Sequence, residues 1–220
     1  MGVDTYSFTY EEDDIMDESG WMVGPFVNYA YHDDSRWMLK VDGRLAFGNV
    51  DYDSQDTGSI DNINDMAAET RMVGGYDFGA IETWRWTPYL GFGYRFLRDE
   101  LGGETSTTGH LGYDRESNYY YLPIGLDINH KTASNWAVGF NVEYDQLLHG
   151  IQESELGDAV DGLDTLENGQ ENGFGVRGSI KLVREFEPVT VSIEPFIRYW
   201  SIDKSEEKEL TFVGSTTGVV

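Results

Sequence analysis

The sequence predicts an all-β fold, an antiparallel up-and-down barrel of about ten strands that occupies residues 1–220 as one domain. Apolar and polar residues alternate along most of the chain, as they do when successive side chains of a strand point to opposite faces. Polar links separate the alternating segments, and short links alternate with long ones. Trp37, Trp86 and Trp136 open strands at intervals of 49 and 50 residues, which indicates a repeated hairpin unit.

The composition excludes several classes of function. Fifteen Lys and Arg stand against 40 Asp and Glu, so the formal net charge of -25 argues against a nucleic-acid partner. The aromatic content of 14% argues against disorder. The absence of Cys removes disulfides, zinc-thiolate sites and cysteine nucleophiles. No apolar run reaches the roughly 18 residues of a spanning helix, and the first residues do not resemble a signal peptide. We therefore expect either a cytosolic chain or a mature chain whose signal peptide has been removed.

Three strands are expected in the first 47 residues. At 5–10, three aromatic residues share one face, and an acidic stretch follows at 11–18. At 21–32, Trp, Val and Tyr alternate with smaller or polar residues up to a turn at 33–36. At 37–47, an apolar face opposes a charged one.

The pattern stops at 51–66, where Asp, Ser, Gly and Asn predict a long loop. Alternation resumes at 68–78, and the short link 79–83 leads to another strand at 86–96. A second long polar loop is expected at 99–116.

Strands are next expected at 119–129 and 136–144, joined by the short link 131–135. The second of these is the most regular in the chain, because its Trp, Val, Phe, Val and Tyr all fall on one face. A third long loop is expected at 150–172, followed by a strand at 174–182.

The last clear strand is expected at 189–199, and residues 209–220 are expected to hold half of a closing strand. This makes nine strands and an incomplete tenth. Because single-chain bacterial barrels have an even strand number and no open edge, we expect about ten strands, with eight as the alternative.

The polar face of the strands decides which side of the barrel is apolar. It carries nearly equal numbers of acids and bases, mixed with Gly, Asn and Ser. A balanced set suits an enclosed interior, where an unpaired charge is costly. We therefore predict a transmembrane barrel, with a soluble, lipocalin-like ligand-binding barrel as the alternative. The predicted interior charges are Lys40, Asp42, Arg44, Glu69, Arg71, Asp77, Arg95, Asp127, Glu143, Asp145, Arg177, Lys181, Glu194 and Arg198.

Aromatic residues are placed where the ends of such strands would meet a membrane interface. Trp37, Trp86 and Trp136 would line the short-turn rim. The opposite rim would hold Trp21, Phe47, Tyr94, Tyr120, Tyr144 and Tyr199.

With its alternating loop lengths and these girdles, the chain resembles the small outer-membrane β-barrel proteins of Gram-negative bacteria, the porin-like and OmpA/OmpX-type barrels. The resemblance implies an outer-membrane location and contact with membrane lipid and lipopolysaccharide. One departure is that such chains commonly end in an aromatic residue, whereas this one ends in Val220.

The interior charges leave two interpretations open, a salt-bridged plug and a narrow, ion-selective pore. Neither needs catalysis or a cofactor, and we expect neither. In both, Glu143 is expected to pair with Arg95, Arg177 or Lys181 rather than to face water.

The long loops offer a candidate cation site. Asp51, Asp53 and Asp56 occur with no Lys or Arg nearby, and hard cations such as calcium take oxygen ligands. Divalent cations are therefore possible loop partners, also in combination with lipopolysaccharide phosphates. The spacing does not match an EF-hand, so solvated acidic loops are the simpler interpretation.

The four histidines show no paired metal spacing. His32 and His130 are expected on the surface at the short-turn end. His149, near Asp145 and Glu143 at the long-loop rim, suggests a rim hydrolase as a further alternative, but the chain has no nucleophile motif.

Overall fold

The computed structural model describes residues 1–12, 15–80, 83–132, 135–205, 208–212 and 215–219. The fold is all-β and antiparallel, with 78% of the chain in strands and one 3-10 turn, η1 (Leu156–Asp158), in the described part. Within the same residues, no helix has the length and apolar content needed to cross a lipid bilayer. Parts of the predicted links at 11–18, 79–83 and 131–135 lie outside the described residues.

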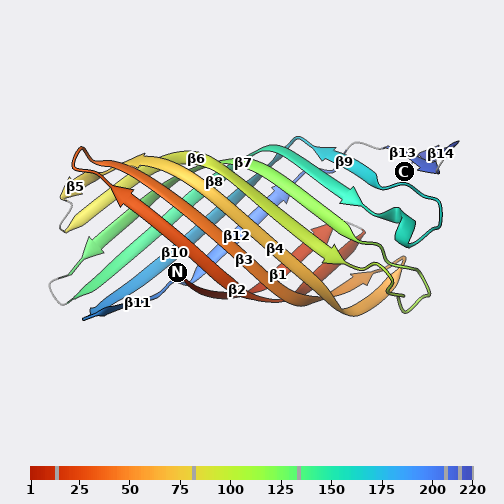
Figure 1. The fold of residues 1–220 in the computed structure, drawn as a ribbon, viewed down its shortest axis with the longest axis horizontal. Coiled ribbons are helices and arrows are strands. Elements are labelled where there is room, and N and C mark those ends of the chain that lie inside the picture. Colours follow the sequence, from red (N-terminus) through yellow and green to blue (C-terminus); the bar gives the residue numbers. More distant parts are fainter. Residues whose placement is uncertain (13–14, 81–82, 133–134, 206–207, 213–214, 220) are drawn as a thin grey trace.

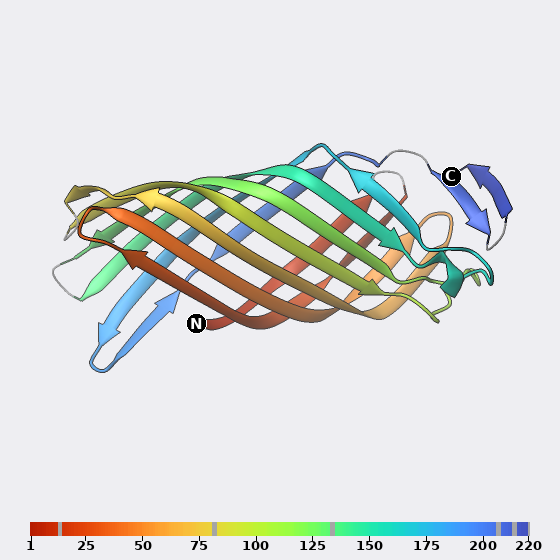
Figure 2. The ribbon, with the colours of Figure 1, turned by 45° about the horizontal axis from the view of Figure 1, so that its top comes forward.

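The main sheet is a curled path of nine strands in which every hydrogen-bonded pair is antiparallel (Figures 1 and 2). In order they are β1 (Gly2–Glu12), β2 (Met16–His32), β3 (Trp37–Ser54), β4 (Gly58–Tyr76), β6 (Trp84–Glu100), β7 (Arg115–Lys131), β8 (Trp136–Ser154), β10 (Gly173–Phe186) and β11 (Val189–Ile193). Three short strands pair beside this path: β5 (Phe78–Ala80) with β6, β9 (Leu166–Gln170) with β8, and β12 (Phe196–Ile202) with β10.

The two edges of the sheet are β1 and the interrupted strand formed by β11 and β12. Both β11 and β12 follow β10, and Glu194 and Pro195 separate them. The ring of Tyr6 on β1 packs edge-on against that of Phe196 on β12, with 5.8 Å between the ring centroids. In the described part of the chain no ladder joins these edges, which run in the same direction because strands of a nine-membered antiparallel path alternate.

The last residues do not close the sheet. Instead of the predicted half strand at 209–220, β13 (Glu209–Phe212) and β14 (Ser215–Val219) form their own antiparallel pair. This pair lies apart from the main sheet, next to the end that carries β9 (Figure 1). Residues 213–214 and 220 lie outside the described part.

The prediction of a long loop at 51–66 is wrong, because β3 and β4 continue through these residues and meet in a short turn. Their outer face is polar, but Val50, Ile60 and Ile63 face inward and are buried. The register shifts between Val50 and Tyr52, and Asn62 has a positive φ of 63°. This irregularity breaks the strict period of two and hides the strands from a pattern search. The loop predicted at 150–172 is likewise shorter, since it contains η1 and β9.

Along most of the sheet, large apolar side chains point outward. We call this outer surface the apolar band. Its outward residues in the strand centres include Val23, Val27, Leu39, Val41, Met72, Leu90, Phe92, Ile124, Phe140, Val142, Val176, Ile180 and Ile197, all exposed. β1 is an exception, because Thr5 and Ser7 face outward while Tyr6 and Phe8 are partly buried.

Beyond the band, the strands continue with the opposite polarity. We call residues 8–12, 16–20, 48–65, 97–119 and 149–172 the extension. Its outward positions on β3 and β4 are acidic or amides, among them Asn49, Asp51, Asp53, Asp61 and Asn64, all exposed. Its interior holds an apolar cluster of Val50, Ile60, Ile63 and Leu101, against which Phe8 and Tyr52 pack.

Candidate functional site

The interior of the band is centred on Arg177, which β10 projects inward and which is 8% exposed. Its Nη2 donates to Glu69 Oε1 on β4 and to Asp145 Oδ2 on β8, both at 2.8 Å. Its Nε lies 2.7 Å from Glu143 Oε1. A single guanidinium therefore joins carboxylates of strands that are far apart along the sheet. Inward polar side chains from different strands thus contact one another across the interior.

A second arginine extends this cluster. Arg71 on β4 donates to Asp42 Oδ2 at 3.0 Å and contacts Glu143 Oε1. The Tyr89 hydroxyl donates to Glu143 Oε2 at 2.6 Å, so both oxygens of this 2% exposed carboxylate have partners. Of the three bases proposed from the sequence for Glu143, the structure places Arg177 beside it. Arg71 was not among the three, because sequence alternation gives the face of a residue but not the strand it meets across the interior.

The other predicted interior charges form smaller pairs around this cluster. Lys40 contacts Asp127 at 3.2 Å, and Lys181 contacts Glu194 at 3.7 Å. Arg44 contacts Asp4, and Arg44 and Arg198 both lie 3.8 Å from Glu69. Arg95 has no ion pair within 4.0 Å in the described residues; its guanidinium lies 5.6 Å from the ring centroid of Trp200.

His32 is not the free surface residue expected at the short-turn end. Its Nδ1 lies 2.6 Å from Asp77 Oδ2, and its side chain is 26% exposed. Asp77 is buried and also accepts a hydrogen bond of 2.6 Å from the Thr87 hydroxyl. His32 joins Asp77 and Thr87 in a network in the interior, because even-numbered residues at this end of β2 face inward. His130, in contrast, shares the outer face with its ladder partner Trp84, on which it stacks with 4.2 Å between the ring centroids.

A cavity of about 690 Å³ occupies the short-turn half of the interior. It extends from His32 and Arg85 to Glu69 and Arg177 of the central cluster, and its walls carry both signs of charge. On the other side of Glu69, the rings of Tyr121 and Trp200 pack edge to face at 5.1 Å. Tyr121 also donates to Glu69 Oε1 at 2.6 Å. Along β4 and β7, Glu69 and Tyr121 lie between residues that line the cavity or its end of the strands and residues of the extension.

The extension has its own buried charged cluster, centred on Arg115 of β7. Arg115 Nη2 donates to Asp99 Oδ2 at 2.8 Å and contacts Glu18, and both acids are buried. Asp65 on β4 is also buried, and no base lies within ion-pair distance of it in the described residues. Burial, reinforced by the charge of Asp99, raises the pKa of Asp65 to about 7. Burial also raises the pKa of Glu18, to about 9.

Nothing in the sequence pattern identified this second cluster. Glu18 lies in the stretch 11–18 and Asp65 in the stretch 51–66, which were assigned to an acidic link and a loop. Arg115 lies in the third such stretch, 99–116. A signal was present nonetheless, since Arg115 is a single base at the end of a long acidic segment.

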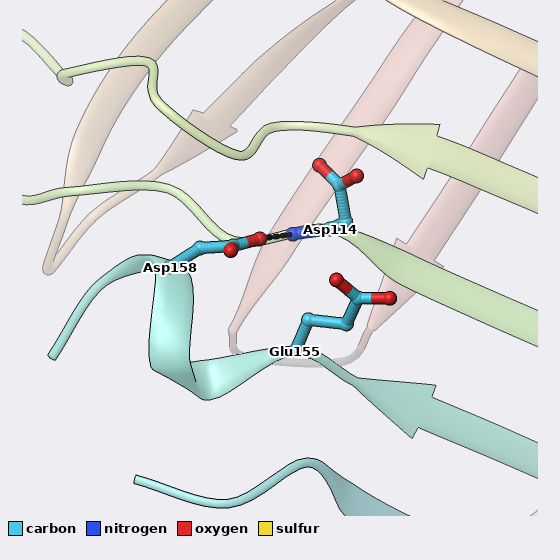
Figure 3. A group of neighbouring side chains, drawn as sticks. All are labelled: Asp114, Glu155 and Asp158. Carbon is cyan, nitrogen blue, oxygen red and sulfur yellow. Dashed lines mark hydrogen bonds between the residues drawn. The ribbon is translucent and has the colours of Figure 1, made fainter. Parts of the chain in front are cut away.

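Acidic side chains also meet on the outer end of the extension. One carboxylate oxygen from each of Asp114, Glu155 and Asp158 lies within 4.8 Å of the other two, and Figure 3 shows the three side chains. Asp114 accepts hydrogen bonds from the Gly102 amide at 2.6 Å and from Arg98 at 3.4 Å. In the described residues this is the one such trio, so the predicted calcium candidates Asp51, Asp53 and Asp56 are not gathered into a site.

The residues of the proposed rim hydrolase are not brought together. Asp145 is 1% exposed and paired with Arg177, whereas His149 is exposed. The register of β7 and β8 shifts between Tyr120 and Tyr121, opposite this part of β8. The extra residue changes which side chains share a face, so the two no longer alternate together.

The aromatic residues proposed as girdles mostly face outward. Trp37, Trp86 and Trp136 are exposed near the short turns, where Trp84 joins them. At the other limit of the band, the exposed aromatic residues are Trp21, Phe47, Tyr120, Tyr144 and Tyr199, and Tyr94 is partly buried against Tyr120.

Comparison with protein-family models and with curated proteins finds no match to this chain.

Proposed function

We propose that this chain is an integral β-barrel protein of the bacterial outer membrane, with a sealed interior and a structural rather than catalytic role. The observation that carries the proposal is the reversal of ordinary polarity in the band. Val142 is 61% exposed and its neighbour Glu143 is 2% exposed. In water this arrangement would expose a large apolar surface and bury charges at high cost. In lipid, apolar side chains are favoured on the outside, and charged side chains are favoured in the interior over contact with lipid.

The dimensions of the band support the same proposal. On β3 the outward apolar residues run from Trp37 to Phe47, and on β8 they run from Trp136 to Tyr144. Segments of this length match the roughly 9 to 11 residues that a tilted strand needs to cross a bilayer. The exposed aromatic residues lie at both limits, where amphipathic rings favour the interface.

A soluble, lipocalin-like barrel is less well supported. That alternative requires an apolar cavity, but the 690 Å³ cavity is lined by Lys40, Arg44, Asp127 and other charged groups. The interior also favours a plug over a narrow pore, because the Arg177 cluster and the Tyr121 and Trp200 rings lie across the route that an ion would take through the barrel.

A transmembrane sheet must also pair its edges, since unsatisfied backbone groups are costly in lipid. We infer that a tenth strand closes the barrel between β12 and β1. Both edges run in the same direction, so one strand running opposite to them would pair antiparallel with each. The chain leaves β12 after Ile202, at the end from which such a strand would start.

Two experiments test this proposal. In detergent, the folded chain should migrate differently on a gel before and after heating, and it should require detergent to remain monomeric. A chain that is folded and monomeric without detergent would refute the membrane assignment. In a planar bilayer, we expect no steady conductance from the wild type. Regular single-channel steps would show that the interior is a pore and not a plug.

A further inference from the structure

The buried acids of the extension are not balanced by bases. Asp65 and Asp99 are direct partners in the ladder of β4 and β6, and both are 7% exposed. Like charges placed directly opposite each other destabilise a sheet. Arg115, the ladder partner of Asp99 on β7, is shared with Glu18. When all three carboxyl groups are ionised, they exceed the single guanidinium by two negative charges, and burial opposes that ionisation.

One oxygen of this cluster has no partner. Arg115 donates twice to Asp99 Oδ2, at 2.8 and 3.1 Å, but the buried Oδ1 has no hydrogen-bond partner in the described residues. Asp99 lines a cavity of about 30 Å³, enough for one water-sized occupant. The cavity is lined by Phe8, Tyr10, Glu18, Asp65, Leu97, Asp99, Arg115, Ser117 and Gln152.

We propose that the extension binds one calcium ion between Asp65 and Asp99, with oxygens of Ser117 and Gln152 as neutral ligands. A divalent ion would cancel the two excess charges and give Asp99 Oδ1 a partner. Oxygen donors select a hard cation. Calcium suits the site better than magnesium, because calcium accepts irregular sets of oxygen ligands, whereas magnesium demands near-octahedral geometry and loses its waters reluctantly.

The exposed trio of Asp114, Glu155 and Asp158 does not carry the same argument. Its residues are exposed or half-buried, and both oxygens of Asp114 already accept hydrogen bonds. At the buried site, the ion would join β4, β6, β7 and β8 and hold the extension together. This role is independent of whether the band lies in a membrane.

Calorimetric titration with calcium and thermal unfolding with calcium or chelator test the proposal on the full chain in detergent micelles. At about pH 8, above the pKa of Asp65, we expect one tight binding event and a higher unfolding temperature with calcium. Asp99→Asn should weaken that event by roughly tenfold or more, and Asp65→Asn should do the same. Asp158→Asn, in the exposed trio, is the matched control and should retain it.

Terbium provides a readout that does not require a folded variant. Excited through tyrosine, terbium bound beside Tyr10 should emit, and calcium should displace it. The proposal is overturned if Asp99→Asn binds calcium as the wild type does, or if the wild type shows no calcium response. In the latter case protons alone would neutralise the cluster.

Discussion

The band and the extension are built from the same strands but have opposite polarity. On β3, Val41 and Leu45 face outward in the band with Asp42 and Arg44 inward, whereas further along Asp51 faces outward. Val50 is fully buried there, inside the apolar cluster of the extension. A strand alternates by geometry alone, so which face is apolar depends on what surrounds it. The reversal within one strand therefore fits the proposed location, with lipid around the band and water around the extension.

The interiors differ in the same sense. In the band, Arg71 and Arg177 serve Glu69, Glu143 and Asp145 in a connected network. In the interior of the extension, Arg115 is the base that contacts the buried acids Glu18 and Asp99, and apolar packing supplies the rest of the core. Uncompensated charge is thus concentrated in the extension.

The largest expected effect comes from removing the central base of the band. Arg177→Met leaves Glu69 and Asp145 buried with fewer partners, so we expect a loss of about 3 to 5 kcal/mol in the free energy of unfolding. Urea unfolding in lipid vesicles measures it. The matched change Arg198→Met, at a base whose nearest carboxylate oxygen is 3.8 Å away, should cost much less. Equal losses in the two variants would mean that the interior is not organised around Arg177.

The next effect concerns the outer faces. Val142→Arg places a charge in the middle of the band and should cost about 2 to 4 kcal/mol in a bilayer. Asp53→Arg, outward on the extension, should change stability by about 0.5 kcal/mol or less. The same assay in vesicles separates them, and a tolerated Val142→Arg would remove the distinction between the two regions.

The smallest expected effect is a pH dependence of the extension. Its facing groups are Tyr6, Tyr10 and Glu12 on β1, Glu18 on β2, Asp65 on β4, Arg95 and Asp99 on β6, and Arg115 on β7. The folded state raises the pKa of Asp65 from 3.8 to about 7, so it binds the proton more tightly than the unfolded chain does. With chelator present, stability should therefore fall as pH rises from about 4 to about 7.

Denaturant midpoints measured across that pH range check this effect. Asp65→Asn should make the dependence less steep, because the amide does not titrate, while Glu18, whose pKa is also raised, maintains the remaining slope. Calcium should reduce the dependence in the wild type. A wild type whose midpoint rises over this range would contradict the assigned direction.

Alternation predicted the strands of the band well, because their outward residues keep a strict period of two between Trp37 and Phe47 or between Trp136 and Tyr144. It failed at 51–66, where a positive φ at Asn62 and a register shift interrupt that period. Alternation also gave the face of inward charges such as Glu143 and Arg177, whereas the predicted interior residue Glu194 is exposed. It did not give the partners of these charges, since the contact between Glu69 and Arg177 depends on how the sheet curls.

The most direct test places a nitroxide label at single introduced cysteines, which is clean because the chain contains no Cys. In lipid vesicles, labels at Val41 and Val142 should be accessible to oxygen and shielded from a water-soluble relaxation agent. A label at Asp51 should show the opposite preference. If all three labels are equally accessible to the water-soluble agent, the band does not lie in lipid and the account is contradicted.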